Sequence, residues 1–259
     1  MKVTILGCGS STPSKWRNPS SQLLEIGDET MMIDCGEGTV LRLLKLDFKH
    51  QKISTIFISH LHGDHYWGLI GLISAMNSSY RVSKLKIFGP FGLKIILSDL
   101  LKISKTKLQF EIDLVEIEHK ASTLLSTPNF QIATFPLVHR LPCNGFIFSE
   151  FESSSTDALP KKYGYCSDTL FLADAQEFPQ NLDLLYHEAT FEQKMQEWAK
   201  KTFHSTSLDA ANAAKNSLAK KMILGHFSSR YQGVDFIIEE ARTIFKETYE
   251  AIEGTTYSV

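Results

Sequence analysis

Long apolar runs, paired cysteines and an excess of charge of one sign are all missing from this sequence of 259 residues. No run of about 18 apolar residues occurs, so we expect no membrane-spanning helix. The four cysteines have no Cys-x-x-Cys spacing, which favours buried, reduced thiols in a cytoplasmic protein over a disulfide framework. The formal net charge of −2 argues mildly against a large nucleic-acid partner, although a local basic patch can be hidden in a neutral total.

Strands and helices do not alternate strictly along the chain, because several strand-like runs come in hairpin-like pairs. This order favours two mixed sheets faced together with helices outside, an α/β (α+β) class of fold. The length suits one compact domain over residues 1–259, and the polar stretch 150–158 is the candidate flexible segment. The strand-like runs are 2–6, 21–26, 30–34, 53–59, 84–88, 109–117, 130–138, 144–149, 183–187 and 220–224, and the helical patterns lie near 38–47, 66–77, 91–103, 191–201, 207–218 and 234–247.

Three histidines and an aspartate fall within six positions, in the segment His60-Leu61-His62-Gly63-Asp64-His65. The apolar run 53–59 precedes them, so they lie where a buried strand ends, which is where open α/β folds usually place their chemistry. Imidazole and carboxylate groups are ligands that zinc and similar divalent metals accept. We expect His60 and His62 to converge on one ion and Asp64 and His65 to face a second. A merely histidine-rich loop is disfavoured, because the chain has only nine histidines.

Further metal ligands are expected downstream. His139 follows a strand-like run, Asp168 lies in the segment 164–169, and His226 follows the apolar run 222–225. Taken singly, each fits an ordinary loop residue, but each ends an apolar run, so each could lie at the same edge as the first cluster.

The motif His-x-His-x-Asp-His resembles the hallmark of the metallo-β-lactamase fold hydrolases, which bind two metals. The resemblance implies a four-layer αββα sandwich and a dinuclear zinc site, with manganese or iron also compatible. It assigns His60, His62 and His139 to one zinc, Asp64, His65 and His226 to the other, and Asp168 as the bridge.

Four further motifs are similar to those of ribonuclease Z, the endonuclease that matures the 3′ ends of tRNA. They are Pro13-Ser14-Lys15-Trp16-Arg17-Asn18, His187-Glu188-Ala189-Thr190, His204-Ser205-Thr206, and His226-Phe227-Ser228-Ser229-Arg230-Tyr231. The resemblance extends over nearly the whole chain and implies removal of the 3′ trailer of precursor tRNA by a homodimer.

These motifs suggest roles for particular side chains. By resemblance, Asp64, His204 and Glu188 are catalytic: Asp64 accepts a proton from the nucleophilic water, His204 acts as a general acid or stabilises charge, and Glu188 orients it. The predicted substrate-binding residues are Lys15, Arg17, Asn18, Thr206 and Arg230. Of these, Lys15 and Arg17 are suited to bind phosphates.

One departure leaves the substrate open. Only 28 residues separate His139 from Asp168, so the long arm with which ribonuclease Z grips tRNA is missing. One alternative is a hydrolase of small or cyclic phosphodiesters with the same site. Another is a nucleic-acid-binding module with structural metals, against which His204 and Glu188 argue because a structural site needs neither. A basic face could replace the arm, although a solvated helix face is the commoner explanation of such a run. The lysines concerned are Lys84, Lys86, Lys94, Lys102, Lys105 and Lys107.

Overall fold

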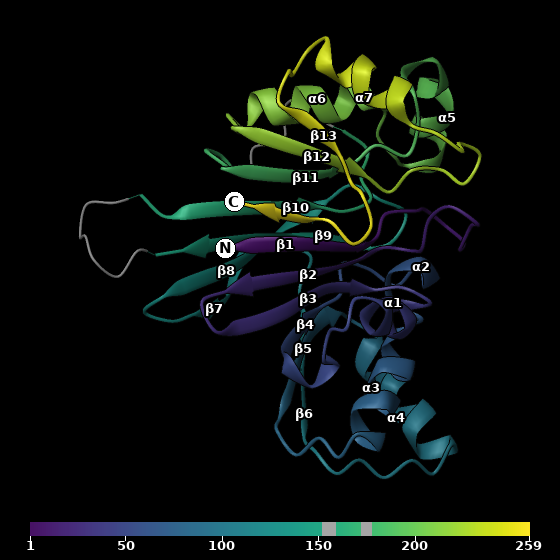
Figure 1. Ribbon diagram of the computed structural model, residues 1–259, viewed down its shortest axis with the longest axis vertical. Coiled ribbons are helices and arrows are strands. Elements are labelled where there is room, and N and C mark those ends of the chain that lie inside the picture. Colours follow the sequence, from purple (N-terminus) through teal and green to yellow (C-terminus); the bar gives the residue numbers. More distant parts are fainter. Residues whose placement is uncertain (152–158, 172–177) are drawn as a thin grey trace. The chain divides into compact units, whose positions relative to one another are not determined.

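The computed structural model describes residues 1–151, 159–171 and 178–259, and these residues form two compact units (Figure 1). The N-terminal unit contains residues 2–118 and 253–256. The C-terminal unit contains residue 1, residues 119–252 and residues 257–259. The expectation of one domain over residues 1–259 stays a prediction.

The sheet of the N-terminal unit runs in the order β14-β1-β2-β3-β4-β5-β6. Strands β1 to β3 pair antiparallel, whereas β3 to β6 pair parallel. The elements are β1 Lys2–Gly7, β2 Ser21–Ile26, β3 Glu29–Cys35, α1 Thr39–Lys45, a 3₁₀ turn at His50–Lys52, β4 Ile53–Phe57, α2 Gly63–Tyr66, α3 Leu69–Ser78, β5 Leu85–Pro90, α4 Leu93–Ile103, β6 Ile112–Ile117 and β14 Thr256–Ser258.

The core of this unit explains why its parallel strands are almost continuously apolar. Ile56 on β4 and Ile87 on β5 are fully buried and pack with Leu72 and Ile73 on α3. A parallel strand with helices packed on it has little contact with water, so apolar residues follow one another along it. The motif His60–His65 begins three residues after Phe57, the last residue of β4. The motif therefore lies at the carboxyl end of the parallel strands of this sheet.

The sheet of the C-terminal unit runs in the order β13-β12-β11-β10-β9-β8-β7. Strands β10, β11, β12 and β13 pair parallel, so their carboxyl ends lie at one edge. Asp168, Glu188 and His226 lie at the ends of three of these strands, β10, β11 and β12. The elements are β7 Ser122–Ser126, β8 Phe130–Leu137, β9 Cys143–Glu150, β10 Lys161–Cys166, β11 Leu184–Glu188, a 3₁₀ turn at Gln193–Met195, α5 Gln196–Thr202, α6 Ser207–Asn216, β12 Lys221–Gly225, α7 Asp235–Arg242 and β13 Thr248–Glu250.

Most predicted elements are found, with differences at specific places. Four short strands, β7, β10, β13 and β14, were not predicted. The helix expected at 66–77 is two helices, because α2 ends at Tyr66 and α3 begins at Leu69. Residues 152–158 of the expected flexible segment lie outside the described residues.

The cysteines are free and buried, as the sequence predicted. Burial raises the pKa of the Cys35 thiol to about 12, the nearby Asp34 carboxylate adds to the rise, and a hydrogen bond with Thr39 opposes it. Among the residues that the structure describes, no helix combines the length and apolar character needed to cross a membrane.

Candidate metal centre

In the N-terminal unit, the first two histidines of the motif meet. His60 Nε2 lies 3.0 Å from His62 Nδ1, a separation that two nitrogens can adopt when both face one ion. His60 Nδ1 lies 3.0 Å from Ser59 Oγ. Because Ser59 Oγ donates to Asp34, it accepts from His60 Nδ1, and the lone pair of His60 is then on Nε2, the atom facing His62.

A fully buried carboxylate, Asp34, orients the last histidine of the motif. His65 Nδ1 donates to Asp34 Oδ2 over 2.7 Å, and the Ser59 backbone amide donates to Asp34 Oδ1 over 2.7 Å. Carboxylates that accept from the second nitrogen of a histidine are the usual supports of metal-bound imidazoles, since they fix the tautomer and raise ligand basicity. Asp34 was not among the predicted site residues, although the segment Asp34-Cys35-Gly36-Glu37-Gly38-Thr39 was a signal that could have identified it.

Asp64, the carboxylate of the motif, is held by a loop from the first strand. The Ser11 backbone amide donates to Asp64 Oδ2 over 2.6 Å, and the same oxygen lies 3.6 Å from His65 Nε2. Ser11 has a left-handed backbone, with φ of 66°. The Ser11 amide therefore fixes one carboxylate oxygen of Asp64 in place.

The loop with the predicted phosphate-binding residues is held together by hydrogen bonds between its own residues. Ser14 Oγ accepts from the backbone amides of Trp16 and Arg17, at 3.2 and 2.9 Å. Beyond it, the Asn18 backbone and side-chain nitrogens donate to the two Glu253 oxygens, each over 2.6 Å. Glu253 also lies 3.5 Å from Arg42. The Asn18 amide group is thus a structural donor, and sequence reasoning missed Glu253 because 235 residues separate the partners.

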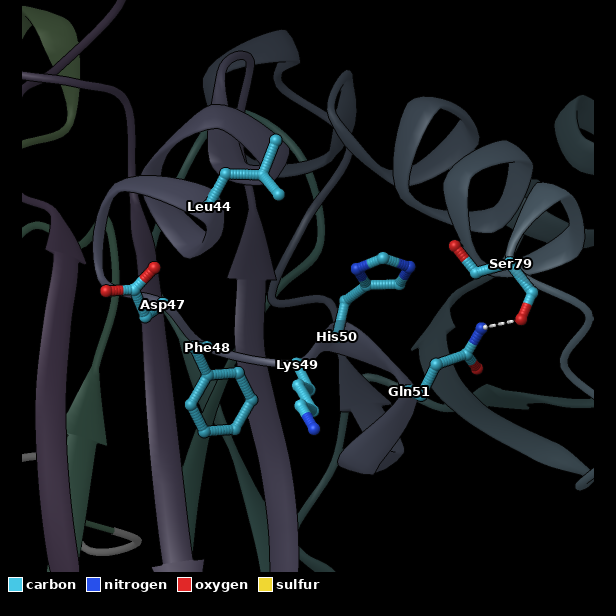
Figure 2. Close-up of a pocket in the computed structure, with 7 residues that line it drawn as sticks. All are labelled: Leu44, Asp47, Phe48, Lys49, His50, Gln51 and Ser79. Carbon is cyan, nitrogen blue, oxygen red and sulfur yellow. Dashed lines mark hydrogen bonds between the residues drawn. The ribbon is translucent and has the colours of Figure 1, made fainter.

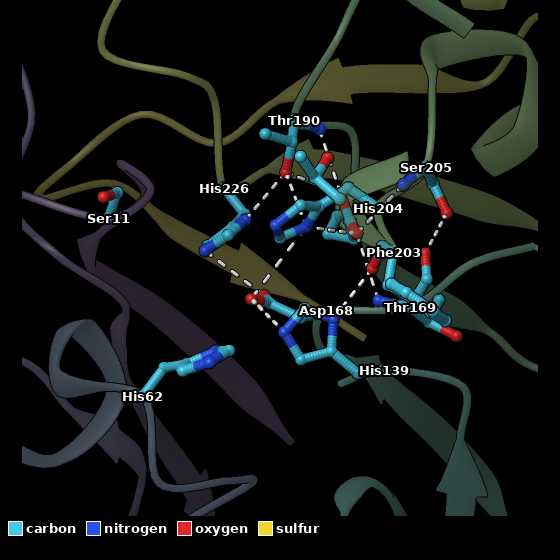
Figure 3. Close-up of polar contacts among 12 residues, drawn as sticks. Ser11, His62, His139, Asp168, Thr169, Thr190, Phe203, His204, Ser205 and His226 are labelled. Carbon is cyan, nitrogen blue, oxygen red and sulfur yellow. Dashed lines mark hydrogen bonds and ion pairs between the residues drawn. The ribbon is translucent and has the colours of Figure 1, made fainter. Parts of the chain in front are cut away.

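In the C-terminal unit, imidazoles group around the buried carboxylate of Asp168 (Figure 3). His226 Nε2 lies 3.2 Å from Asp168 Oδ1, and His139 Nε2 lies 3.8 Å from Asp168 Oδ2. His139 Nδ1 donates to the Phe203 carbonyl over 2.8 Å, so the lone pair of His139 is on Nε2, which faces Asp168. Two imidazole nitrogens directed at one carboxylate are a nitrogen and oxygen donor set that fits a divalent metal.

A threonine orients His226 by contacting the ring nitrogen that does not face Asp168. His226 Nδ1 lies 2.9 Å from Thr190 Oγ, which donates its own proton to Glu188 Oε2 over 2.7 Å. Thr190 must therefore accept from His226, and the His226 lone pair is on Nε2. His226 and Phe203 both have left-handed backbones, with φ of 57° and 60°. Such conformations are costly outside glycine and are often retained at functional sites.

His204, which is partly exposed, and the fully buried Glu188 form a hydrogen-bonded pair. His204 Nδ1 donates to Glu188 Oε1 over 3.0 Å, and the catalytic roles of the two residues stay predictions. Burial alone raises the pKa of Glu188, but the charge and hydrogen bond of His204 outweigh burial and lower it below its ordinary value. Asp168, His204 and His226 are close enough to hold an ion together, with donor atoms within 4.8 Å of one another. His204 approaches Asp168 through Nδ1, at 4.0 Å, and that nitrogen is the one bound to Glu188, so an acid–base role suits His204 better than ligation.

Two predicted substrate-binding residues have structural partners. Thr206 is buried and caps α6, since its hydroxyl group accepts from the Asp209 amide and its own amide donates to Asp209. Arg230 is exposed, donates to Ser228 Oγ over 3.0 Å and lies over the Phe191 ring at 4.9 Å. The role of each toward a substrate stays a prediction.

A pocket in the N-terminal unit contains none of these motif residues. The pocket has a volume of about 350 Å³. Figure 2 shows the residues that line it. Its lining residues are Leu44, Asp47, Phe48, Lys49, His50, Gln51 and Ser79. The chemistry predicted from the motifs therefore does not depend on this pocket.

Comparison with known proteins decides the family. A family model described as Anti-Pycsar protein Apyc1 matches residues 1–248. Curated relatives named ribonuclease Z cover both chains almost fully: the one from Cytophaga hutchinsonii is 40% identical (100% of this chain, 96% of the relative), and the one from Bacteroides thetaiotaomicron is 34% identical (100% and 95%). The chain belongs to the ribonuclease Z family and to the family that this model describes.

Solved structures agree with this family and identify the fold. Human tRNase Z, short form, superposes with a TM-score of 0.82 at 30% identity, covering 100% of this chain and 99% of the human one. The metallo-β-lactamase fold protein YhfI from Bacillus subtilis gives a TM-score of 0.80 at 23% identity, covering 99% and 98%, which supports the fold alone. The predicted fold class is confirmed, since two mixed sheets with helices form the metallo-β-lactamase fold. Like the ribonuclease Z family, the chain is a metal-dependent hydrolase.

The ribonuclease Z relatives are longer than this chain in their interior. The alignment with the Bacteroides thetaiotaomicron protein has 300 positions, whereas this chain has 259 residues, a difference of 41. At least that many positions of the relative lack a counterpart here. The short interval of 28 residues between His139 and Asp168 is where the family resemblance places the arm.

Proposed function

We propose that the chain is a two-metal phosphodiesterase that removes the 3′ trailer of precursor tRNA. The observation that carries this proposal is the hydrogen bond between His204 and the buried Glu188 beside Asp168, because a site that only binds metal has no need of an oriented histidine. Its relatives named ribonuclease Z and tRNase Z support an RNA substrate. We also propose that it works in the cytoplasm as a homodimer, on the basis of its reduced cysteines and the family resemblance.

The proposed metal ligands are assigned from the order of the motifs in the sequence. The imidazole and carboxylate groups that lie close together within each unit support this assignment. By the family resemblance, His60, His62 and His139 would hold one zinc ion and Asp64, His65 and His226 the other, with Asp168 as a ligand that the two ions would share. Metal pairs of this kind acidify a water molecule and stabilise the attacking and leaving oxygens. The buried partners Asp34 and Thr190 fix the ligand tautomers.

The protein's own groups supply the proton transfers. Asp64, held by the Ser11 amide, accepts a proton from the attacking water. His204 donates a proton to the 3′ oxygen that leaves the phosphorus atom, and Glu188 stabilises the protonated imidazole before that step. The products are a tRNA with a 3′-hydroxyl and a trailer with a 5′-phosphate. Lys15, Arg17, Asn18, Thr206 and Arg230 are the proposed substrate contacts.

A second function is favoured by one observation, the missing arm. A hydrolase of small or cyclic phosphodiesters needs the same metal ligands and the same His204, but no surface for distant parts of a tRNA. The shortfall of 41 positions against a full-length relative fits this alternative directly. A nucleic-acid-binding module with structural metals is disfavoured by the His204–Glu188 pair.

The two functions are separated by one side-by-side assay. Precursor tRNA, a cyclic nucleotide and a chromogenic phosphodiester are offered to the metal-loaded protein, with Asp168→Ala as the inactive control. Trailer removal that is lost in Asp168→Ala supports the ribonuclease. Turnover of the small diesters without any binding or cleavage of precursor tRNA overturns it and supports the second function.

A further inference from the structure

An exposed tryptophan directly follows the metal motif. Trp67 lies two residues after His65, directly follows the last residue of α2, and has 63% of its surface exposed. Large aromatic side chains are usually covered in a folded protein, since each buries 150–250 Å² when packed. A ring left uncovered beside the reactive motif suggests a surface that the substrate completes.

Gly63, the glycine of the motif, backs this ring. A Cβ atom on Gly63 would lie 2.3 Å from Cε2 and 2.4 Å from Cδ2 of Trp67, far inside contact distance. The indole therefore rests against the Gly63 backbone, which only glycine permits. The Trp67 amide also donates to the Gly63 carbonyl over 2.9 Å, so the backbone that carries the ring is fixed.

A ring held in this way is preorganised for stacking. Unpaired nucleobases stack on tryptophan irrespective of sequence, because every base has a π face. Binding to an already ordered ring avoids the entropy cost of ordering it. The Trp67 ring lies against Gly63, the residue before Asp64 in the motif, so a base next to a phosphate held at this motif is the part of a nucleotide substrate that would reach the ring.

We propose that Trp67 is the stacking surface for an unpaired nucleobase next to the scissile phosphate of the substrate. The inference rests on the proposed phosphodiesterase function but not on the size of the substrate. The base can belong to a precursor RNA or to a small nucleotide, and the test includes both. Trp67 is thus a binding residue, distinct from the metal ligands and from His204.

A fluorescence titration tests the stacking without turnover. The chain has three tryptophans, so Trp16→Phe combined with Trp198→Phe leaves Trp67 as the sole indole. The metal-loaded double variant is titrated with adenosine 5′-monophosphate, with ribose 5-phosphate, and with a short single-stranded RNA. Saturable quenching by either base-containing ligand, without quenching by ribose 5-phosphate, supports the proposal. Equal responses with and without a base, or no saturable response to any ligand, overturn it.

A cycle of protein and substrate changes tests the same contact in catalysis. Removing the base beside the cleavage site should lower kcat/KM of the wild type by about 5- to 100-fold, the scale of one stacked base. Trp67→Leu should lose a similar factor, and the abasic substrate should then cost it less than about 2-fold more. Trp67→Phe, which keeps a ring, should recover most of the loss. If the two losses multiply, Trp67 does not stack on that base.

The two failures are distinguishable. If precursor RNA is not cleaved while a chromogenic diester is, the ribonuclease function fails. The titration with adenosine 5′-monophosphate then decides the stacking by itself.

Discussion

At the scale of single residues, the proposed proton transfer by His204 depends on the hydrogen bonds that the Glu188 carboxylate accepts. Its carboxylate accepts from the Thr169, Thr190 and Ser205 backbone amides, each over 3.0 Å, as well as from His204. So many donors fix the carboxylate rigidly, and the carboxylate fixes the imidazole. His204 is therefore positioned for proton transfer before a substrate arrives.

Replacing this histidine separates chemistry from metal binding. His204→Ala should keep its bound metal and lose about 10²–10⁴-fold in kcat, the usual scale of general acid–base catalysis. Metal content by elemental analysis and turnover of a phosphodiester are measured on the same preparation. Asp168→Ala, the control, should lose both. Metal loss in His204→Ala, or an unchanged rate, would contradict the assigned role.

At the scale of elements, the C-terminal segment holds the loop of the predicted phosphate-binding residues. The Gly254 amide donates to the Ile5 carbonyl over 2.8 Å, which pins the segment to β1 and places Glu253 against Asn18. Glu253→Ala leaves the Asn18 nitrogens without their acceptors and should destabilise the protein by about 1–3 kcal/mol.

The same change should raise KM for a nucleotide substrate more than it lowers kcat, because Lys15 and Arg17 are carried by this loop. Glu253→Gln, which retains one acceptor oxygen, should recover part of the loss. Glu239→Ala on α7 is the matched control, since this exposed glutamate pairs only with the neighbouring Arg242 among its described contacts. An unchanged KM in Glu253→Ala would separate the loop from substrate binding.

The ion pair between Asp183 and Lys220 ties the start of β11 to the residue before β12. Burial raises the pKa of Asp183, but hydrogen bonds from Lys220, over 2.7 Å, and from the Lys162 amide, over 2.8 Å, outweigh it and lower the pKa below its ordinary value. A carboxyl with a lowered folded-state pKa stabilises the protein above its unfolded pKa, and this contribution is lost as the pH falls through the folded value.

Asp183→Asn should therefore lower the melting temperature at pH 7, by an amount corresponding to about 0.5–1 kcal/mol for a partly exposed pair. The difference from the wild type should shrink as the pH falls below about 4, the ordinary range of aspartate. Thermal unfolding followed by circular dichroism over this pH range measures both. Asp99→Asn, at an exposed position on α4, is the control; a difference that grows in acid would refute the assigned pKa direction.

The sequence predicted elements well where local pattern and packing agree. The run 53–59 is β-branched and apolar because β4 lies between two parallel strands, so pattern and burial agree. Strand β10 was missed because Lys161–Cys166 contains two lysines and a glycine and lacks β-branched residues. Gly164 is required there, since a Cβ atom would lie 2.7 Å from Leu182 Cδ1. No local pattern carries that packing requirement.

The sequence predicted the candidate metal ligands of the site but not the residues that orient them. The motif His-x-His-x-Asp-His places several metal-ligand types within one short segment, so this part of the candidate site could be predicted from the sequence. Asp34 and Thr190, which fix the tautomers, are common residues whose roles come only from tertiary contacts at 2.7 and 2.9 Å. Glu253 could not be predicted, because only the fold brings it to Asn18.

At the scale of the whole molecule, the number of candidate ligands sets the metal content. Seven residues are proposed as ligands, whereas one tetrahedral site takes four. Protein purified without added metal should approach two equivalents, mostly zinc, by elemental analysis. Saturation at one equivalent that zinc supplementation does not raise would rule out the dinuclear assignment.

The distribution of surface charge decides how an armless chain can hold an RNA. Lys84 lies 2.8 Å from Glu111, and Lys86 lies 3.9 Å from Asp113, so part of the basic run is neutralised locally. The exposed lysines in the last turn of α4 and just after it are Lys102, Lys105 and Lys107. These three are the better candidates for contacts with phosphates.

Reversing all three charges, by Lys102→Glu, Lys105→Glu and Lys107→Glu, should weaken cleavage of precursor tRNA and leave a chromogenic diester unaffected, because the small substrate reaches only the metals. Each phosphate contact contributes about 0.7–0.9 to the slope of log affinity against log salt, so the slope should fall by that amount for each lysine that contacts RNA. Lys84→Gln combined with Lys86→Gln is the matched control and should change neither rate. If the triple variant cuts precursor tRNA at the wild-type rate with the same salt slope, the RNA is held elsewhere, by the loop of Lys15 and Arg17 or by a second subunit.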